Sequence, residues 1–184
     1  MVLIEQQISA PEVIKPEVLI KQDFFPEHAA LFELLSKGIC WDESMAVRKT
    51  ASFGVPYNYA QLSYPAVPIH TALLPVAEKL LLQLKIEFNN CLLNFYESGE
   101  NTMGYHADDT TGLQTNTGVA IVSLGSARNI TYRSKLNPTI RHAFNLAPGS
   151  LLYMDSTLQE SWVHAIRKQR DVGPRISLTW RAFR

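Results

Sequence analysis

The segment RISLTWR, residues 175–181, alternates polar and apolar side chains with a period of two. This period is typical of a β-strand, in which neighbouring side chains point to opposite faces of a sheet. One face would carry Arg175, Ser177, Thr179 and Arg181, and the other would carry Ile176, Leu178 and Trp180. If the polar face lies inside the protein, two buried guanidinium groups are costly unless an anion binds there. The alternative is that both arginines are solvated charges at a sheet edge.

Short strand-like segments fill the chain from residue 90 onward. They cover residues 91–96, 119–124, 129–133, 143–146, 150–154 and 175–180, and turns rich in glycine and proline separate them. A further early strand is expected at residues 17–21. Many short strands after two helices predict an α+β protein, in which a double-stranded β-helix (jelly roll) is buttressed on one face by N-terminal helices.

Two helices are expected before these strands. Pro26 opens the first, Lys37-Gly38 ends it, and Leu31, Leu34 and Leu35 give it an apolar face. The second has Thr71 as its cap and Pro75 in its first turn. Its apolar stripe consists of Leu73, Val76, Ala77, Leu80, Leu81 and Leu84. Helices of this kind usually cover one face of a sheet.

Length and composition favour a single domain of 184 residues. We expect an N-terminal extension and helix at residues 1–45, a β-hairpin lid at 46–70 and the jelly roll at 90–184. The 17 basic and 17 acidic residues cancel, so no overall charge attracts nucleic acid. The two cysteines cannot form a disulfide framework, and neither a signal peptide nor a membrane-spanning apolar run is evident. These features predict a cytoplasmic protein.

Three side chains form a candidate metal site. His106 and Asp108 are two residues apart at an expected strand end, and His164 opens a later strand. Alternate residues of an extended chain point the same way, and antiparallel strands can bring distant strand ends together. Two imidazoles and one carboxylate can occupy one face of an octahedral Fe(II), which leaves open positions for a co-substrate and oxygen. Alone, the His-x-Asp pair would be read as an ordinary loop histidine beside an acidic residue.

A dicarboxylate co-substrate would complete this chemistry. The planar guanidinium of Arg175 can bind a carboxylate through paired hydrogen bonds. Asn94 and Tyr96 share one face of their strand and are candidate donors to the same ligand, although packing alone could also explain the tyrosine. Together these residues indicate an oxygenase that depends on iron and 2-oxoglutarate.

Several motifs resemble the AlkB family of nucleic-acid dealkylating dioxygenases. These are Asn-Phe-Tyr-x-x-Gly at 94–99, Met-Gly-Tyr-His-Ala-Asp-Asp at 103–109, Ile-Val-Ser-Leu-Gly at 121–125, Trp-Val-His at 162–164 and the segment 175–181. The stretch 48–59 is similar to the family's nucleotide-recognition lid. The resemblance covers residues 46–184.

The resemblance implies a jelly-roll enzyme in which His106, Asp108 and His164 hold Fe(II). It also implies that 2-oxoglutarate and O2 are co-substrates, with Arg175, Asn94, Tyr96, Ser177 and Arg181 around the 2-oxoglutarate. Arg181 could instead lie over the target base. The implied reaction is oxidative demethylation of bases such as 1-methyladenine or 3-methylcytosine in DNA or RNA, which releases formaldehyde, succinate and carbon dioxide.

The substrate side carries further expectations. A base must leave its stack to be oxidised and is then held between aromatic or apolar side chains. The candidates for substrate contact are Phe53, Tyr57, Tyr59, Asp109 and Trp162. Each aromatic residue has ordinary packing as its alternative.

Two positions depart from the family pattern. Thr110 stands where DNA-repair members usually carry an acidic residue that reads the base, and Ser177 stands where a bacterial member typically has asparagine. The first leaves the identity of the base open.

Charge and these departures leave the substrate class open. A local basic track could come from Arg48, Lys49, Arg128, Arg133, Lys135, Arg167, Lys168 and Arg170, unless these are simply solvated. Single-stranded or short alkylated DNA or RNA suits a neutral protein better than a long duplex. The same oxygenase chemistry on a small molecule or a protein side chain is an alternative, and a non-catalytic binding module is a remote one. Oligomeric state is not predicted.

Overall fold

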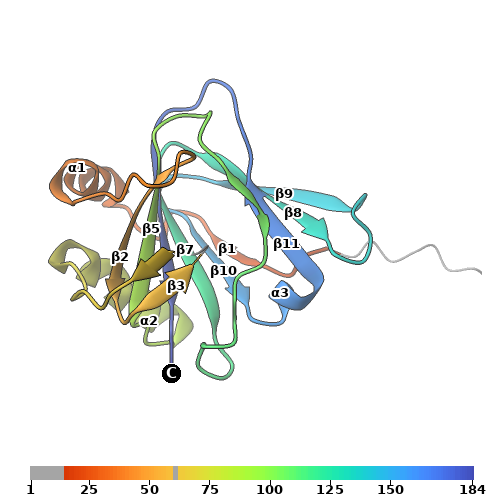
Figure 1. Cartoon of the computed structure of the whole chain (residues 1–184), viewed down its shortest axis with the longest axis horizontal. Coiled ribbons are helices and arrows are strands. Elements are labelled where there is room, and N and C mark those ends of the chain that lie inside the picture. Colours follow the sequence, from red (N-terminus) through yellow and green to blue (C-terminus); the bar gives the residue numbers. More distant parts are fainter. Residues whose placement is uncertain (1–14, 60–61) are drawn as a thin grey trace, which may run out of the picture.

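Two antiparallel sheets face each other in a computed structural model that describes residues 15–59 and 62–184 (Figure 1). The larger sheet has the strand order β1-β10-β7-β12-β5-β2, and the smaller has the order β6-β11-β8-β9. The larger consists of β1 (Leu19–Lys21), β10 (Leu151–Asp155), β7 (Gly118–Gly125), β12 (Arg175–Arg181), β5 (Asn90–Tyr96) and β2 (Lys49–Gly54). The smaller consists of β6 (Met103–His106), β11 (Trp162–Ile166), β8 (Arg128–Ser134) and β9 (Arg141–Leu146). This arrangement confirms the expected jelly roll.

Strand β12 lies near the centre of the larger sheet and pairs with β5 on one side and β7 on the other. Its apolar face, with Ile176, Leu178 and Trp180, belongs to the core beneath the helices. Its polar face, Arg175 to Arg181 at alternate positions, lines a pocket between the sheets. All seven residues of this strand are buried. The alternative of solvated edge arginines is therefore wrong.

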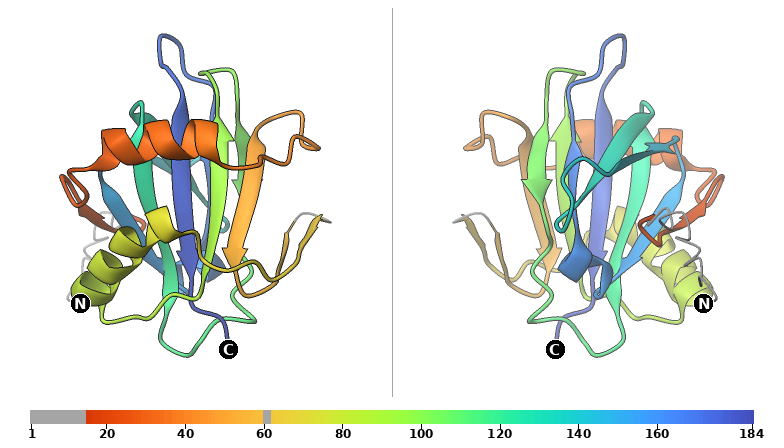
Figure 2. Two further views of the ribbon diagram at one scale, coloured as in Figure 1. Left: turned by 90° about the vertical axis from the view of Figure 1, so that its left-hand side faces the viewer. Right: turned by 90° about the vertical axis from the view of Figure 1, so that its right-hand side faces the viewer.

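Two helices lie across the outer face of the larger sheet (Figure 2): α1 (His28–Gly38) and α2 (Leu74–Leu84), which follows the short 3₁₀ helix η1 (Thr71–Leu73). Leu31 and Leu35 of α1 and Val76 and Leu80 of α2 are buried against the sheet. The expected stripes were too wide, because Leu34 and Leu81 are exposed on the outer sides of the helices.

The helix starts differ in detail from the sequence prediction. Helix α1 begins two residues after Pro26. Thr71 does not cap the second helix, because the imidazole of His70 accepts the hydrogen bond from the Ala72 N–H instead. Pro75 does lie in the first turn of α2, as expected. No helix in the described part of the chain is long and apolar enough to span a membrane.

The expected lid at residues 46–70 divides into two parts. Strand β2 is an edge strand of the larger sheet, in register with β5. Only β3 (Tyr57–Tyr59) and β4 (Leu62–Tyr64) form a separate hairpin. The hairpin projects from the edge of the larger sheet next to β2 (Figure 2).

Candidate metal centre and co-substrate pocket

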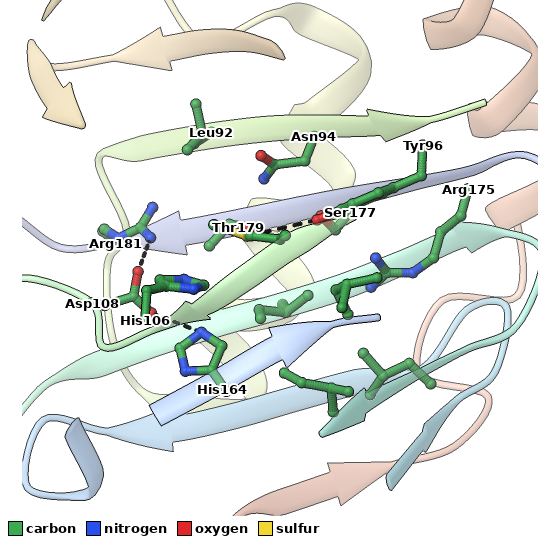
Figure 3. Close-up of a pocket in the computed structure, with 15 residues that line it drawn as sticks. Leu92, Asn94, Tyr96, His106, Asp108, His164, Arg175, Ser177, Thr179 and Arg181 are labelled. Atoms are coloured by element: carbon green, nitrogen blue, oxygen red, sulfur yellow. Dashed lines mark hydrogen bonds and ion pairs between the residues drawn. The ribbon is translucent and has the colours of Figure 1, made fainter. Parts of the chain in front are cut away.

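The two sheets bring His106, Asp108 and His164 together at one end of the pocket (Figure 3). His106 ends β6, and β6 pairs with β11 so that His106 lies directly opposite His164. The candidate ligand atoms of the three side chains all lie within 4.8 Å of one another. One ligand from each of two paired strands and one from the following loop therefore form a compact two-histidine, one-carboxylate set, which is the donor set that suits Fe(II).

Asp108 is ionised despite its burial. Burial alone would raise the pKa of its carboxyl group, but the charge of the Arg181 guanidinium is the largest opposing effect, and the pKa is lowered to about 2. Arg181 donates a hydrogen bond to Asp108 Oδ1, and His164 Nε2 lies 3.5 Å from Oδ2. The carboxylate is thus ready to bind a cation.

Both histidines suit metal binding as neutral rings. His106 Nδ1 lies 2.8 Å from the Gly104 carbonyl oxygen, which can only accept, so Nδ1 carries the proton and Nε2 keeps its lone pair. Burial lowers the pKa of His164 to about 4, because a charged imidazole is poorly solvated there, although Asp108 opposes the shift. Near neutral pH, the His164 ring therefore need not lose a charge to bind a metal.

Arg175 lies at the opposite end of the pocket and is 1% exposed. Its Nη2 donates to Ser123 Oγ at 2.9 Å, and its Cζ lies 5.5 Å from the centre of the Tyr96 ring. Its Nε and Nη1 are buried with no hydrogen-bond partner among the described residues. A buried guanidinium with unused donors is costly, and a carboxylate would satisfy it. Asn94, Tyr96 and Ser177 line the same pocket.

The pocket is narrow without a ligand. Its open volume is about 30 Å³, room for one or two water molecules, so a dicarboxylate enters only if side chains move. Met103 is an unbranched, adaptable residue of the lining, and its sulfur lies 3.7 Å from the Tyr96 hydroxyl. Movement of Met103 would both widen the pocket and release this hydroxyl to a ligand.

Gln159 is a buried residue of the site that sequence reasoning missed. It lies in the short helix α3 (Leu158–Ser161), and its Oε1 accepts the backbone N–H of Asp108 at 3.0 Å. Asp155 accepts the N–H of Leu158 at the start of this helix, and Lys135 Nζ donates to the carbonyl of Gln159. Gln159 therefore fixes the backbone from which the metal-binding carboxylate projects. A polar residue five positions before His164 gave no sequence signal of this role.

Arg128 was expected to contribute to a basic track, and this prediction was wrong. The side chain is fully buried, and its two terminal nitrogens donate to the carbonyl oxygens of Ser98, Asn101 and Arg167. It therefore joins the loop before β6 to the segment after β11. Since β6 and β11 carry the two histidines, Arg128 supports the frame of the metal site.

Two of the expected aromatic contacts lie away from the pocket. Phe53 points to the helix side of β2, where it packs on the core and meets His70 edge-to-face at 5.7 Å. Trp162 is 4% exposed in the core between the sheets, beside His142. The structure therefore gives both residues a packing role, because strand pairing turns their side chains away from the open end of the site.

Tyr57 does lie at the site. Its ring is 4.7 Å from Arg181 Cζ and 5.4 Å from the ring of Phe183, which the sequence prediction had not included. Arg181 pairs with Asp108 beside this ring. Asp109 is exposed and accepts hydrogen bonds from Thr111. The Tyr59 side chain lies outside the described part of the structure.

This combination of fold and site is that of the oxygenases that bind ferrous iron and 2-oxoglutarate. Residues 24–181 match the family model described as the 2OG-Fe(II) oxygenase superfamily. The chain therefore belongs to that superfamily, and its AlkB-like character, expected from the motifs, is confirmed by its relatives. The family uses Fe(II), 2-oxoglutarate and O2, and the triad of His106, Asp108 and His164 is a group that could hold such an ion.

Among these relatives is the bovine (Bos taurus) protein named DNA oxidative demethylase ALKBH2, 31% identical over 145 residues, or 73% of this chain and 52% of that protein. The mouse (Mus musculus) alpha-ketoglutarate-dependent dioxygenase alkB homolog 3 is 29% identical over 174 residues, which cover 82% of this chain and 60% of the mouse protein. The chain thus spans about half to two thirds of the length of these relatives. The solved structure of OsALKBH1 superposes with a TM-score of 0.67 at 14% identity, covering 92% of this chain and all of that one, which supports the fold.

Proposed function

We propose that this protein is an Fe(II)- and 2-oxoglutarate-dependent demethylase that removes N-methyl groups from nucleic-acid bases of the 1-methyladenine or 3-methylcytosine type. The observation that carries the proposal is a single pocket with the triad of His106, Asp108 and His164 at one end and a buried, incompletely paired Arg175 at the other. Relatives of about 30% identity that are named as a DNA oxidative demethylase support the substrate class.

His106, Asp108 and His164 would hold the iron on one face. When bound, Fe(II) supplies the oxidation of the N-methyl group by O2, with 2-oxoglutarate leaving as succinate and carbon dioxide and the methyl carbon leaving as formaldehyde. Arg181 balances the charge of Asp108, and Gln159 holds the Asp108 backbone in place.

The other end of the pocket would orient the co-substrate. The Nε and Nη1 of Arg175, which have no hydrogen-bond partner among the described residues, can donate hydrogen bonds to a carboxylate of the co-substrate. Asn94 has its Oδ1 engaged by Arg48 Nε at 2.8 Å, which leaves its amide N–H groups to face the pocket as donors. Ile121, Ile130 and Leu146 form an apolar wall that keeps water away from these hydrogen bonds.

Tyr57 and Phe183 would receive the target base beside the triad. Their tilted rings lie next to Arg181 at the open end of the site, where a flipped base could stack. A neutral chain favours single-stranded or short substrates, because each phosphate contact of a duplex requires a basic side chain. The burial of Arg128 reduces the available basic surface further.

A second candidate is hydroxylation of a small molecule or a protein side chain by the same site. Thr110 favours this reading, because it stands where DNA-repair members usually carry an acidic residue that reads the base.

One assay separates the two candidates. The protein is incubated with Fe(II), 2-oxoglutarate and a panel of methylated single-stranded DNA, RNA and free nucleosides, and succinate and formaldehyde are both measured. We expect the two products in equal amounts with a methylated strand. Succinate without formaldehyde across the whole panel would refute demethylation and favour the second candidate. A His106→Ala variant is the control and should form neither product.

A further inference from the structure

We propose that a cleft over the free edge of β2 binds a second nucleobase, one that belongs to the substrate strand but is not the base being oxidised. The proposal rests on the proposed function in one respect, namely that the ligand is a nucleic acid. The cleft lies between the segments 38–42 and 63–67 and has a volume of about 520 Å³. A pocket of this size is in the range of small-molecule sites.

The floor of the cleft is an unpaired piece of sheet edge. Thr50 exchanges two backbone hydrogen bonds with Asp42, and Gly54 exchanges two with Val67, so the backbone groups of Thr50 and Gly54 point to the outer edge of β2. By the alternation of an antiparallel strand, the N–H and C=O of Ser52 point the same way. Neither group has a hydrogen-bond partner in the described backbone.

The gap at Ser52 is too short for another strand. Asp42 closes it on one side and Val67 on the other, so only one N–H and one C=O are available. A planar ring with a hydrogen-bond acceptor next to a donor can bind both groups, because the acceptor faces the Ser52 N–H and the donor faces the Ser52 C=O. Nucleobases carry such edges, and proteins that recognise single strands bind them by their Watson–Crick and Hoogsteen edges. The width of the gap therefore favours a base over a peptide.

Aromatic rings border the same gap. Tyr64 is buried with its hydroxyl 2.8 Å from Thr50 Oγ1, so its ring is fixed beside the strand edge. Phe53 and His70 line the other side, in edge-to-face contact with each other. Rings at such a site provide stacking that tolerates any base. Phe53, which does not reach the metal pocket, thus has a place in this cleft.

The charges of the cleft point to a base and not to a phosphate. Among the residues that the structure describes, no lysine or arginine lines it, and Asp42 is the one acidic residue. The Asp42 carboxylate accepts the Ser44 N–H at 2.8 Å, and this backbone hydrogen bond lowers its pKa, so it stays ionised. An ionised carboxylate repels phosphate and can accept a hydrogen bond from an exocyclic amine.

The test is equilibrium binding of a short unmethylated DNA strand and of an equally long strand of abasic sugars to the full chain. Ser52→Pro removes the outward N–H, and proline is tolerated in edge strands. Ser52→Ala is the matched control, because both variants lose the Oγ that accepts from Asn90 but only alanine keeps the N–H. We expect Ser52→Pro to bind the base-containing strand roughly 2- to 12-fold more weakly than Ser52→Ala, the value of one hydrogen bond, with equal affinities for the abasic strand. Equal affinity of both variants for the base-containing strand would overturn the proposal.

A labelling experiment on the unaltered chain keeps the proposal testable if Ser52→Pro fails to fold. Cys40 lines the cleft and is exposed, whereas Cys91 is buried, so a thiol reagent modifies the folded protein at Cys40. The base-containing strand should slow the modification of Cys40, and the abasic strand should not. Equal modification rates with the two strands would overturn the second site. If strand binding depends on Ser52 but no formaldehyde is produced, the proposed function alone is refuted. If the protein demethylates the strand but binding does not depend on Ser52, this second site alone is refuted.

Discussion

Replacing Gln159 by methionine tests whether this residue positions the metal-binding carboxylate. Methionine has nearly the same volume as glutamine but cannot accept the hydrogen bond from the Asp108 N–H, which is 3.0 Å long in a buried setting. An unsatisfied buried N–H costs about 1–3 kcal/mol. In a domain of this size that loss lowers Tm by roughly 2–12 °C.

The effect on metal binding should exceed the effect on the fold. Partners that hold metal ligands in place typically contribute about 10- to 100-fold to metal affinity. We therefore expect Gln159→Met to weaken Fe(II) binding by that factor, measured by anaerobic calorimetry with saturating 2-oxoglutarate. The matched control is Gln169→Met, because the Gln169 side chain also accepts a backbone N–H, from Asn129, but on the surface. Its expected change in stability is within about 0.5 kcal/mol, with no change in metal affinity.

Two outcomes would refute this reasoning. If Gln159→Met lowers Tm but binds Fe(II) like the unaltered protein, Gln159 supports only the fold. If neither quantity changes, the Asp108 N–H does not depend on Gln159 at all.

Three other substitutions or additions give further tests. Arg175→Met should raise the KM for 2-oxoglutarate by roughly 10- to 150-fold, since each hydrogen bond to a charged group contributes about 1.5–3 kcal/mol, and an unchanged KM would place the co-substrate elsewhere. Arg128→Met should lower the free energy of unfolding by about 1.5–3 kcal/mol in denaturant titrations, because three partly buried hydrogen bonds from a charged group to carbonyl oxygens are lost, and a loss below about 1 kcal/mol would contradict the proposed support of the loops. Fe(II) at about 100 times its Kd should stabilise the protein by about 2.7 kcal/mol under anaerobic conditions, and a shift in Tm that persists in His106→Ala would exclude the triad as the binding site.

The strand and ligand patterns could be predicted because they depend on neighbours in the chain. The alternation in residues 175–181 assigns each side chain to a face whatever the sheet around it, so the arginine face could be predicted, whereas its burial was decided by the pairing of β12 with β5 and β7. The spacing of His106 and Asp108 places both side chains on one side of an extended segment in the same way. The helical stripes were found for the same reason, although their width was overestimated at Leu34 and Leu81.

The pairing of strands settled what the sequence left open. Phe53 and Trp162 are aromatic and were therefore candidates for base stacking. Strand pairing turns Phe53 toward the helices and buries Trp162 between the sheets. Arginine is usually a surface residue, but Arg128 is enclosed by loops from two distant parts of the chain. These loops present three carbonyl oxygens to its guanidinium group.

The sequence by itself therefore predicted the strands of the jelly roll, the candidate iron ligands and the arginine face opposite them, because each prediction depends on a short local pattern. The tertiary structure decided which residues support that site: Gln159 behind Asp108, Arg128 between the loops, and Tyr57 with Phe183 above Arg181. It also decided that β2 leaves an unpaired edge at Ser52. These contacts join residues far apart in the chain, and no local periodicity records which of them will meet.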